Sequence, residues 1–170
     1  MPRIIEGQLQ FDFPTGWEAA KFDEWSFYVN QFQSFCGGAK AIDVIAVEPS
    51  VCLWKIEAKD YRQHRRNKTI DLAEEVAIKV RDSLAAIIAA QANANQADEQ
   101  RIARKASRCP RVRVVLHLEQ PRKHSSLFPR AIDPAKVKQR LKQLIKAIDP
   151  HPLVLEMGRM QGVAWTVQQT

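Results

Sequence analysis

Apolar and polar residues alternate with the period of a β-strand at several places along the chain. Residues 5–13 alternate in this way and predict a half-buried strand. Segments 40–47 and 51–59 predict the two strands of a β-hairpin, because Pro49 between them favours a turn. Further strands are predicted at 111–119, 153–157 and 163–167, the last two as a terminal pair.

Other segments carry apolar residues at helical spacing. Residues 17–35 predict a first helix, which the glycines at 37 and 38 end. A long second helix is predicted from Asp71, a capping residue, to about residue 107. A third helix over 134–148 begins with a proline at its first position. No repeat or second domain is visible, so the pattern predicts one α/β domain that spans residues 1–170.

The composition agrees with a single globular domain. The chain has 170 residues, of which 45% are hydrophobic and 26% are charged, enough to bury a core without disulfides or structural metal. Its longest apolar stretch, around residues 84–90, is far shorter than the roughly 20 residues that cross a bilayer. Three cysteines without a CxxC pair argue against a disulfide framework and a zinc site. Because the N-terminus also lacks a signal-peptide pattern, we expect a cytoplasmic protein without a membrane anchor.

Positive charge is concentrated in one part of the chain. The formal net charge is +7, yet residues 101–146 contain 14 basic and 2 acidic residues, a local charge of +12, and the remainder carries −5. Such an asymmetry is expected of a protein that faces a polyanion on one side. The alternative explanation is a solvated basic surface.

Candidate chemistry lies in the predicted hairpin, which contains Asp43, Glu57 and Lys59. Side chains two positions apart on a strand share a face, so Glu57 and Lys59 point together. A three- or five-residue turn places Asp43 opposite Lys55 or Glu57, and both registers put it on that face. Two carboxylates offer oxygen ligands that Mg²⁺ prefers, and a nearby ammonium can orient or deprotonate the attacking water. These residue types predict metal-assisted hydrolysis of a phosphodiester.

Asp43 followed, after a hairpin turn, by the Glu57-Ala58-Lys59 sequence resembles the PD-(D/E)XK nuclease superfamily, which has the restriction-endonuclease-like fold. The resemblance covers roughly residues 17–119, including the helix before the hairpin and the helix and strand after it. It implies a central mixed β-sheet flanked by helices on both faces, with residues 134–167 packed on that core.

The resemblance also implies roles for particular residues. Asp43 and Glu57 would bind Mg²⁺ or Mn²⁺, and Lys59 would act on the attacking water. Some members of the superfamily add a glutamate from the first helix; Glu18 and Glu24 are the candidates here, and Glu18 is preferred because Glu24 is surrounded by core-facing aromatic residues. The expected activity is that of a metal-dependent endonuclease acting on DNA.

The segment that follows the Glu57-Ala58-Lys59 strand is basic and should lie at the edge of the site. Its cations are expected to contact phosphates, unless they form only a solvated loop. These residues are Arg62, Arg65, Arg66 and Lys68. Two other classes of function remain open: a catalytically inactive restriction-like module for nucleic-acid binding or assembly, and a protein-interaction subunit. The resemblance also makes a homodimer, or action with a partner protein, reasonable for a small nuclease that must cut both strands.

Overall fold

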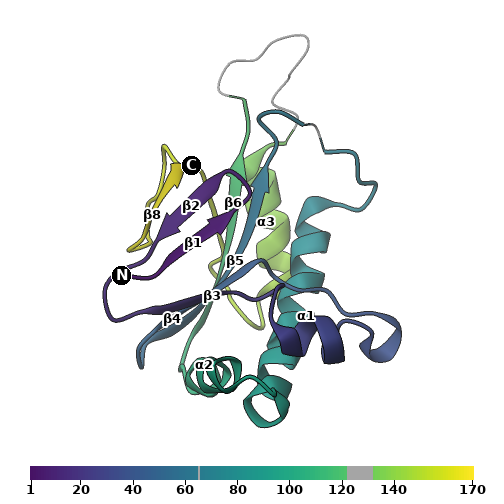
Figure 1. The fold of residues 1–170 in the computed structure, drawn as a ribbon. Helices are drawn as coiled ribbons and strands as arrows, with labels where there is room; N and C mark the ends of the chain where they lie inside the picture. Colours follow the sequence, from purple (N-terminus) through teal and green to yellow (C-terminus); the bar gives the residue numbers. More distant parts are fainter. Residues whose placement is uncertain (65, 122–131) are drawn as a thin grey trace.

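A five-stranded mixed sheet forms the centre of the molecule (Figure 1). The computed structural model describes residues 1–64, 66–121 and 132–170. The strand order is β3-β4-β5-β6-β7; β3, β4 and β5 are antiparallel neighbours, whereas β5, β6 and β7 run parallel. The strands are β3 (Glu18–Lys21), β4 (Val44–Glu48), β5 (Cys52–Asp60), β6 (Val112–Glu119) and β7 (Leu153–Leu155). The predicted mixed α/β fold is therefore confirmed.

The two faces of this sheet are covered by different layers. On one face pack α1 (Leu72–Asn93), α2 (Ala97–Ser107) and α3 (Pro134–Ile145), which share one apolar core with the sheet. On the other face packs a second sheet of β1 (Arg3–Glu6), β2 (Leu9–Asp12) and β8 (Thr166–Gln169). The expectation of helices on both faces is thus wrong for the described residues. Alternate residues of β4 and β5 serve the two cores, as their period of two requires.

The N-terminal segment 5–13 forms a hairpin instead of one strand. β1 pairs antiparallel with β2, and Gly7 occupies the turn with a φ of 57°, which favours glycine. The two-residue turn shifts the alternation by one residue, because Ile4 pairs with Phe11 and packs on the core, whereas Ile5 is 51% exposed. The apolar residues at odd positions therefore resemble one continuous strand only in the sequence. The two C-terminal strands are likewise not a pair: β7 lies beside β6, and β8 lies beside β2.

The predicted first helix over 17–35 is also incorrect. Residues Glu18–Lys21 form β3, which pairs with β4, and the bond from Phe22 N to Asp43 O (2.8 Å) extends this pairing. Helical backbone is confined to two short segments, Tyr28–Phe32 and Phe35–Gly37, and the two residues before the first of them. Pairing with the open edge of β4 therefore outweighs the helical spacing of the aromatic residues.

The prediction for α1 is correct at its start. Asp71 is the N-cap, and its carboxylate accepts a hydrogen bond from Glu74 N (3.1 Å). The helix ends at Asn93, because Ala94 and Gln96 are extended and α2 begins at Ala97. The break lets α2 fold back so that its Ala103 and Ala106 reach the same core. No helix in the described ranges is long and apolar enough to span a bilayer.

Candidate functional site

The β4–β5 hairpin positions the predicted acidic residues. Val44 lies opposite Ile56 and Glu48 opposite Cys52, so a three-residue turn joins the strands. Continued by one residue, this register places Asp43 opposite Glu57, one of the two registers that the sequence allows. The Ala58 N–H donates to Asp43 Oδ2 (2.8 Å) and fixes that carboxylate beside β5.

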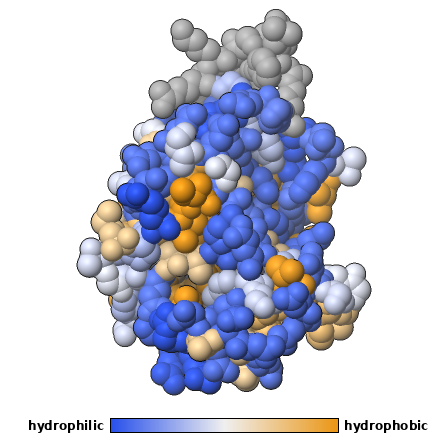
Figure 2. All heavy atoms as spheres, viewed as in Figure 1, coloured by the Kyte–Doolittle hydropathy of each residue, from blue (hydrophilic) through white to orange (hydrophobic). Residues whose placement is uncertain are grey.

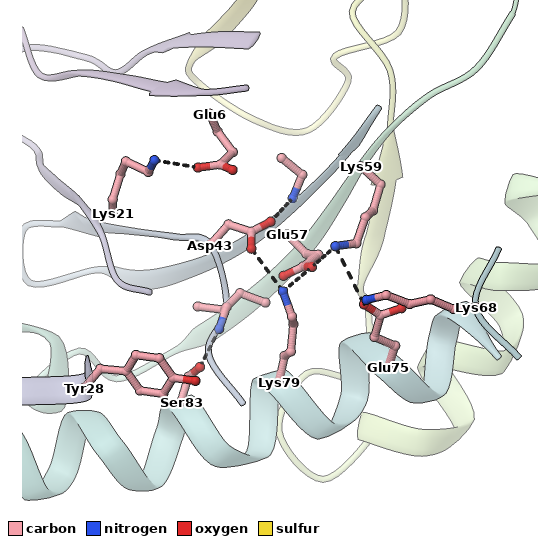
Figure 3. Close-up of polar contacts among 12 residues, drawn as sticks. Glu6, Lys21, Tyr28, Asp43, Glu57, Lys59, Lys68, Glu75, Lys79 and Ser83 are labelled. Atoms are coloured by element: carbon pink, nitrogen blue, oxygen red, sulfur yellow. Dashed lines mark hydrogen bonds and ion pairs between the residues drawn. The ribbon is translucent and has the colours of Figure 1, made fainter. Parts of the chain in front are cut away.

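Helix α1 adds a lysine between the two carboxylates (Figure 3). Lys79 Nζ lies 3.0 Å from Asp43 Oδ1 and 2.5 Å from Glu57 Oε1. Lys59 Nζ lies 2.6 Å from the same Glu57 oxygen. The three residues predicted from the hairpin therefore come together, with Lys79 as a fourth member.

Glu75 links this group to the basic segment after β5. It lies four residues before Lys79 and so on the same face of α1. Its carboxylate is 3.7 Å from Lys59 Nζ, 2.5 Å from Lys68 Nζ and 2.7 Å from the Arg66 guanidinium. We refer to Asp43, Glu57, Lys59, Glu75 and Lys79 as the ionic network. Acids and bases alternate along it, from Asp43, the residue before β4, to the surface.

Burial and neighbouring charge shift the pKa values in the network. Burial, reinforced by the Asp43 carboxylate, raises the pKa of the fully buried Glu57 to about 7. Burial lowers the pKa of Lys79, but Glu57 and Asp43 outweigh it and hold that pKa above its ordinary value. Burial raises the pKa of Glu75, but the Lys68 and Arg66 contacts prevail and lower it to about 2. Glu57 is thus the member that can exchange a proton near neutral pH.

A surface pocket opens beside Lys59. The pocket is lined by Lys59 and Asp60 of β5, by Tyr61, which follows the strand, and by residues of the basic segment after it. The basic residues in this lining are Lys59, His64, Arg66 and Lys68. Lys59 is only 17% exposed, so its ammonium connects the buried carboxylates with a positively charged opening.

Asp23 is a further acidic residue that the sequence did not reveal. Its Oδ1 is buried without a hydrogen-bond partner in the described part of the chain. Burial, followed by the Asp43 and Glu6 carboxylates, raises its pKa to about 6. Asp23 follows β3, in a region expected to be helical, so helical spacing gave no signal of its proximity to Asp43.

Lys55 is a second residue that the sequence did not reveal. It shares the β5 face of Glu57, is fully buried, and donates from Nζ to Val80 O (2.9 Å) of α1. Burial holds its pKa well below the ordinary value. Lys55 therefore contacts the helix and lies outside the ionic network.

The remaining predicted carboxylates are elsewhere. Glu18 lies on β3 opposite Val47, at the far end of the strand from Asp43, and its carboxylate pairs with Arg101 and Lys105 of α2. Glu24 is 63% exposed and pairs with Lys21 (2.5 Å). Neither joins the ionic network.

The predicted phosphate-binding residues divide into two groups. Arg66 and Lys68 contact Glu75 and lie beside the network. Arg62 instead pairs with Asp60 (2.5 Å) and donates to the Gln169 side chain (3.0 Å). Arg65 lies outside the described residues.

Comparisons with known proteins give one partial match. A cysteine–tRNA ligase of Neisseria meningitidis serogroup A is 32% identical over 163 residues, which cover 78% of this chain and 23% of that protein. The chain thus spans less than a quarter of the length of this relative. No family model and no solved structure matches the chain.

Proposed function

We propose that the chain is a metal-dependent nuclease of the restriction-endonuclease-like class that hydrolyses phosphodiester bonds in DNA. The supporting observation is the convergence of Asp43, Glu57 and Lys59 beside a cation-lined pocket. Acidic groups that can hold a divalent cation are thereby joined to groups that attract phosphate. A pairing of this kind is what metal-assisted phosphodiester hydrolysis needs.

The donor set fits Mg²⁺ or Mn²⁺. Mg²⁺ is commonly held by one or two carboxylates, with water and substrate phosphate as its other ligands. Asp43 and Glu57 supply these carboxylates, and the buried Glu57 Oε2 has no hydrogen-bond partner in the described ranges. No three His, Cys, Asp or Glu side chains among those residues form a metal-binding group, so the ion would depend on this pair. When bound, it would supply a Lewis acid that activates water and offsets phosphoryl charge.

The other residues have roles that follow from their positions. Lys59 extends from the buried Glu57 to the pocket, where its ammonium can orient the attacking water and stabilise charge on the phosphoryl oxygens. Lys68 is 55% exposed, and it can contact a phosphate while Glu75 keeps its amine near Lys59. Glu57 must be ionised to hold a cation, and its neighbours Lys59 and Lys79 favour that state.

One observation favours the alternative of a catalytically inactive nucleic-acid-binding or assembly module. Lys79 and Lys59 already supply counter-charges to Asp43 and Glu57, as expected where a charge network only stabilises the fold. The matched relative is named for tRNA, so RNA is the second polymer to test. For the proposed nuclease, we further propose action as a homodimer or with a partner protein.

The direct test is cleavage by the purified chain. Single-stranded DNA, duplex DNA and tRNA are incubated with the protein in Mg²⁺, Mn²⁺ or chelator. We expect metal-dependent cleavage of DNA, and a loss of about 100-fold or more in Asp43→Asn, Glu57→Gln and Lys59→Met. Asp98→Asn and Lys146→Met remove the same charges at exposed positions and should cleave like the parent chain.

Three outcomes contradict the nuclease. Undiminished cleavage in all three site variants would place the activity elsewhere or in a contaminant. Salt-sensitive binding without metal-dependent cleavage would support the inactive module. Absence of both binding and cleavage would support the third class of function, a protein-interaction subunit.

A further inference from the structure

A second pocket continues from the candidate site across the molecule. It lies between the N-terminal ends of α1 and α3 and is lined by Leu72 of α1, Val137 of α3 and, just before α1, Ile70. Arg66 lines this pocket and also the pocket beside Lys59. The two hollows therefore adjoin the same side chain, Arg66, and together we call them the basic groove.

Cations dominate the outer part of the basic groove. Lys136 and Arg140 of α3 line it with Arg66. The two aspartates in its lining, Asp71 and Asp133, cap α1 and α3 and accept hydrogen bonds from backbone amides. Their charge is partly offset by these bonds and by the helix ends. Arg140 pairs with Glu74 (2.9 Å) and Arg66 with Glu75 (2.7 Å), and both side chains line the pocket together with Lys136.

Arg66 is held rigidly where the two hollows meet. Its guanidinium donates to Glu75 (2.7 Å), to the Tyr61 hydroxyl (3.1 Å) and to Ile70 O (2.6 Å). These partners lie just after β5, just before α1 and within α1, and they fix the side chain in place before any ligand arrives. A group held in this way loses little conformational entropy on binding.

The spacing on α3 selects which of its cations can take part. Lys136 and Arg140 are four residues apart and share one side of the helix, next to Arg66. Lys138 and Lys142 are offset by two positions, beyond the buried stripe of Val137, and line neither hollow. The basic surface of α3 is therefore divided by its apolar stripe, and one half continues the candidate site.

We infer that the basic groove binds the phosphodiester backbone of a DNA strand that leads from Lys59 to Lys136 and Arg140 of α3. This inference rests on the proposed nuclease function and adds the path of its substrate. The aromatic side chains among the described lining are Tyr61, whose hydroxyl accepts a hydrogen bond from Arg66, and His64, and the lining cations are the Lys and Arg side chains. Contacts of this kind hold phosphates without reading bases, so binding should be nearly independent of sequence.

The test compares two charge reversals on the same helix. Lys136→Glu/Arg140→Glu and Lys138→Glu/Lys142→Glu change the net charge equally, but only the first pair lines the basic groove. Binding of fluorescein-labelled DNA is measured by anisotropy in chelator, over a series of salt concentrations. We expect the first variant to bind at least about tenfold more weakly and to lose about one to two units of the slope of log affinity against log salt, and the second to bind like the parent.

A neutral variant covers the possibility of misfolding, because Arg140 pairs with Glu74 (2.9 Å) and its reversal places two acids together. Lys136→Gln/Arg140→Gln should show a smaller loss in the same direction, with an unchanged thermal transition. Equal losses in the two reversal variants, or no loss in either, would overturn the groove. Metal-dependent cleavage by the parent chain would still stand in that event, so the two proposals fail separately.

Discussion

Lys79 lies between Asp43 and Glu57, the two carboxylates that would hold a divalent cation. Its ammonium contacts one oxygen of each carboxylate, and it lies in surroundings of low polarity where charge interactions are strong. Without a metal it reduces the repulsion between the two acids. With a metal it competes, because two cations cannot share the same oxygens.

Lys79→Met should therefore tighten metal binding. The variant keeps the length of the side chain and removes the competing charge, so Asp43 and Glu57 repel each other until a cation binds. At a pH well above the pKa of Glu57, where that carboxylate is ionised without the help of Lys79, we expect the Mn²⁺ affinity to rise by about tenfold or more, which corresponds to about 1.4 kcal/mol. Mn²⁺ titration followed by electron paramagnetic resonance checks this, with Lys146→Met as the control. Unchanged or weaker binding in Lys79→Met would mean that the lysine does not occupy the metal position.

Glu57 makes stability depend on pH. Its pKa is about 7 in the folded chain against an ordinary 4.5, so between these values the folded state binds more protons than the unfolded state. Stability should fall as pH rises through this window, by up to about 1.4 kcal/mol per pH unit for one proton, and level off above it. Asp23 acts in the same direction up to about pH 6.

Urea unfolding between about pH 5 and pH 8 measures this slope. Glu57→Gln cannot ionise, so its slope should be shallower than that of the parent, with the part due to Asp23 remaining. Asp98→Asn should keep the full slope. Parallel curves for the parent and Glu57→Gln would contradict the raised pKa.

Short elements in this fold depend on distant partners. The helical segment that begins near Ser26 lacks a capping side chain of its own, and its first amides are satisfied by Glu99 of α2. The carboxylate accepts from Ser26 N (2.6 Å) and from Phe27 N (3.0 Å). A residue more than seventy positions away thus performs the function of an N-cap.

Glu99→Ala should destabilise the chain by about 1–2 kcal/mol, because two partly buried amides lose their acceptor. The neighbouring Asp98→Ala removes an exposed carboxylate and should cost less than about 0.5 kcal/mol. Urea unfolding gives both values, and hydrogen exchange should show lower protection at Ser26 and Phe27 in the first variant alone. Similar stabilities would rule out this capping role.

The parts of the site that are close in sequence could be predicted. Pro49 and the lengths of the two strands limit the hairpin to registers that place Asp43 on the face of Glu57 and Lys59, and this holds in the structure. Lys79 could not be found in the same way, because its position depends on how α1 docks on β5. No local pattern of polar and apolar residues encodes that docking.

The sequence pattern was misleading between Trp17 and Phe35, where helical spacing is compatible with another structure. Aromatic residues between Trp17 and Phe35 have helical spacing, yet a strand, a turn and two short helical segments bury most of them equally well. The predicted site glutamate was therefore wrong. Glu18 pairs with α2, whereas the acid near Asp43 is Asp23. Pairing between strands is a tertiary property, and it decided the outcome here.

The charge of the whole molecule is more divided than its composition indicates. Figure 2 shows a largely hydrophilic surface with separate apolar patches on this side of the molecule. Among the described residues of 101–146 the basic side chains are divided between separate places: Arg101 is engaged by Glu18 beside β3, whereas Lys136 and Arg140 line the basic groove. Only part of the +12 is therefore next to the candidate site, and a polyanion would meet that part through α3.

The ionic network also sets the alignment of α1 along β5. A slide of the helix by one turn, about 5.4 Å, would bring either Glu75 or Ser83 to the place of Lys79. The first shift would gather three carboxylates, and the second would leave Glu57 buried without that counter-ion; a buried charge without a partner costs several kcal/mol. Apolar packing alone would tolerate such a slide more readily. The same charges that make the site chemically interesting therefore give the helix a single resting position on the sheet.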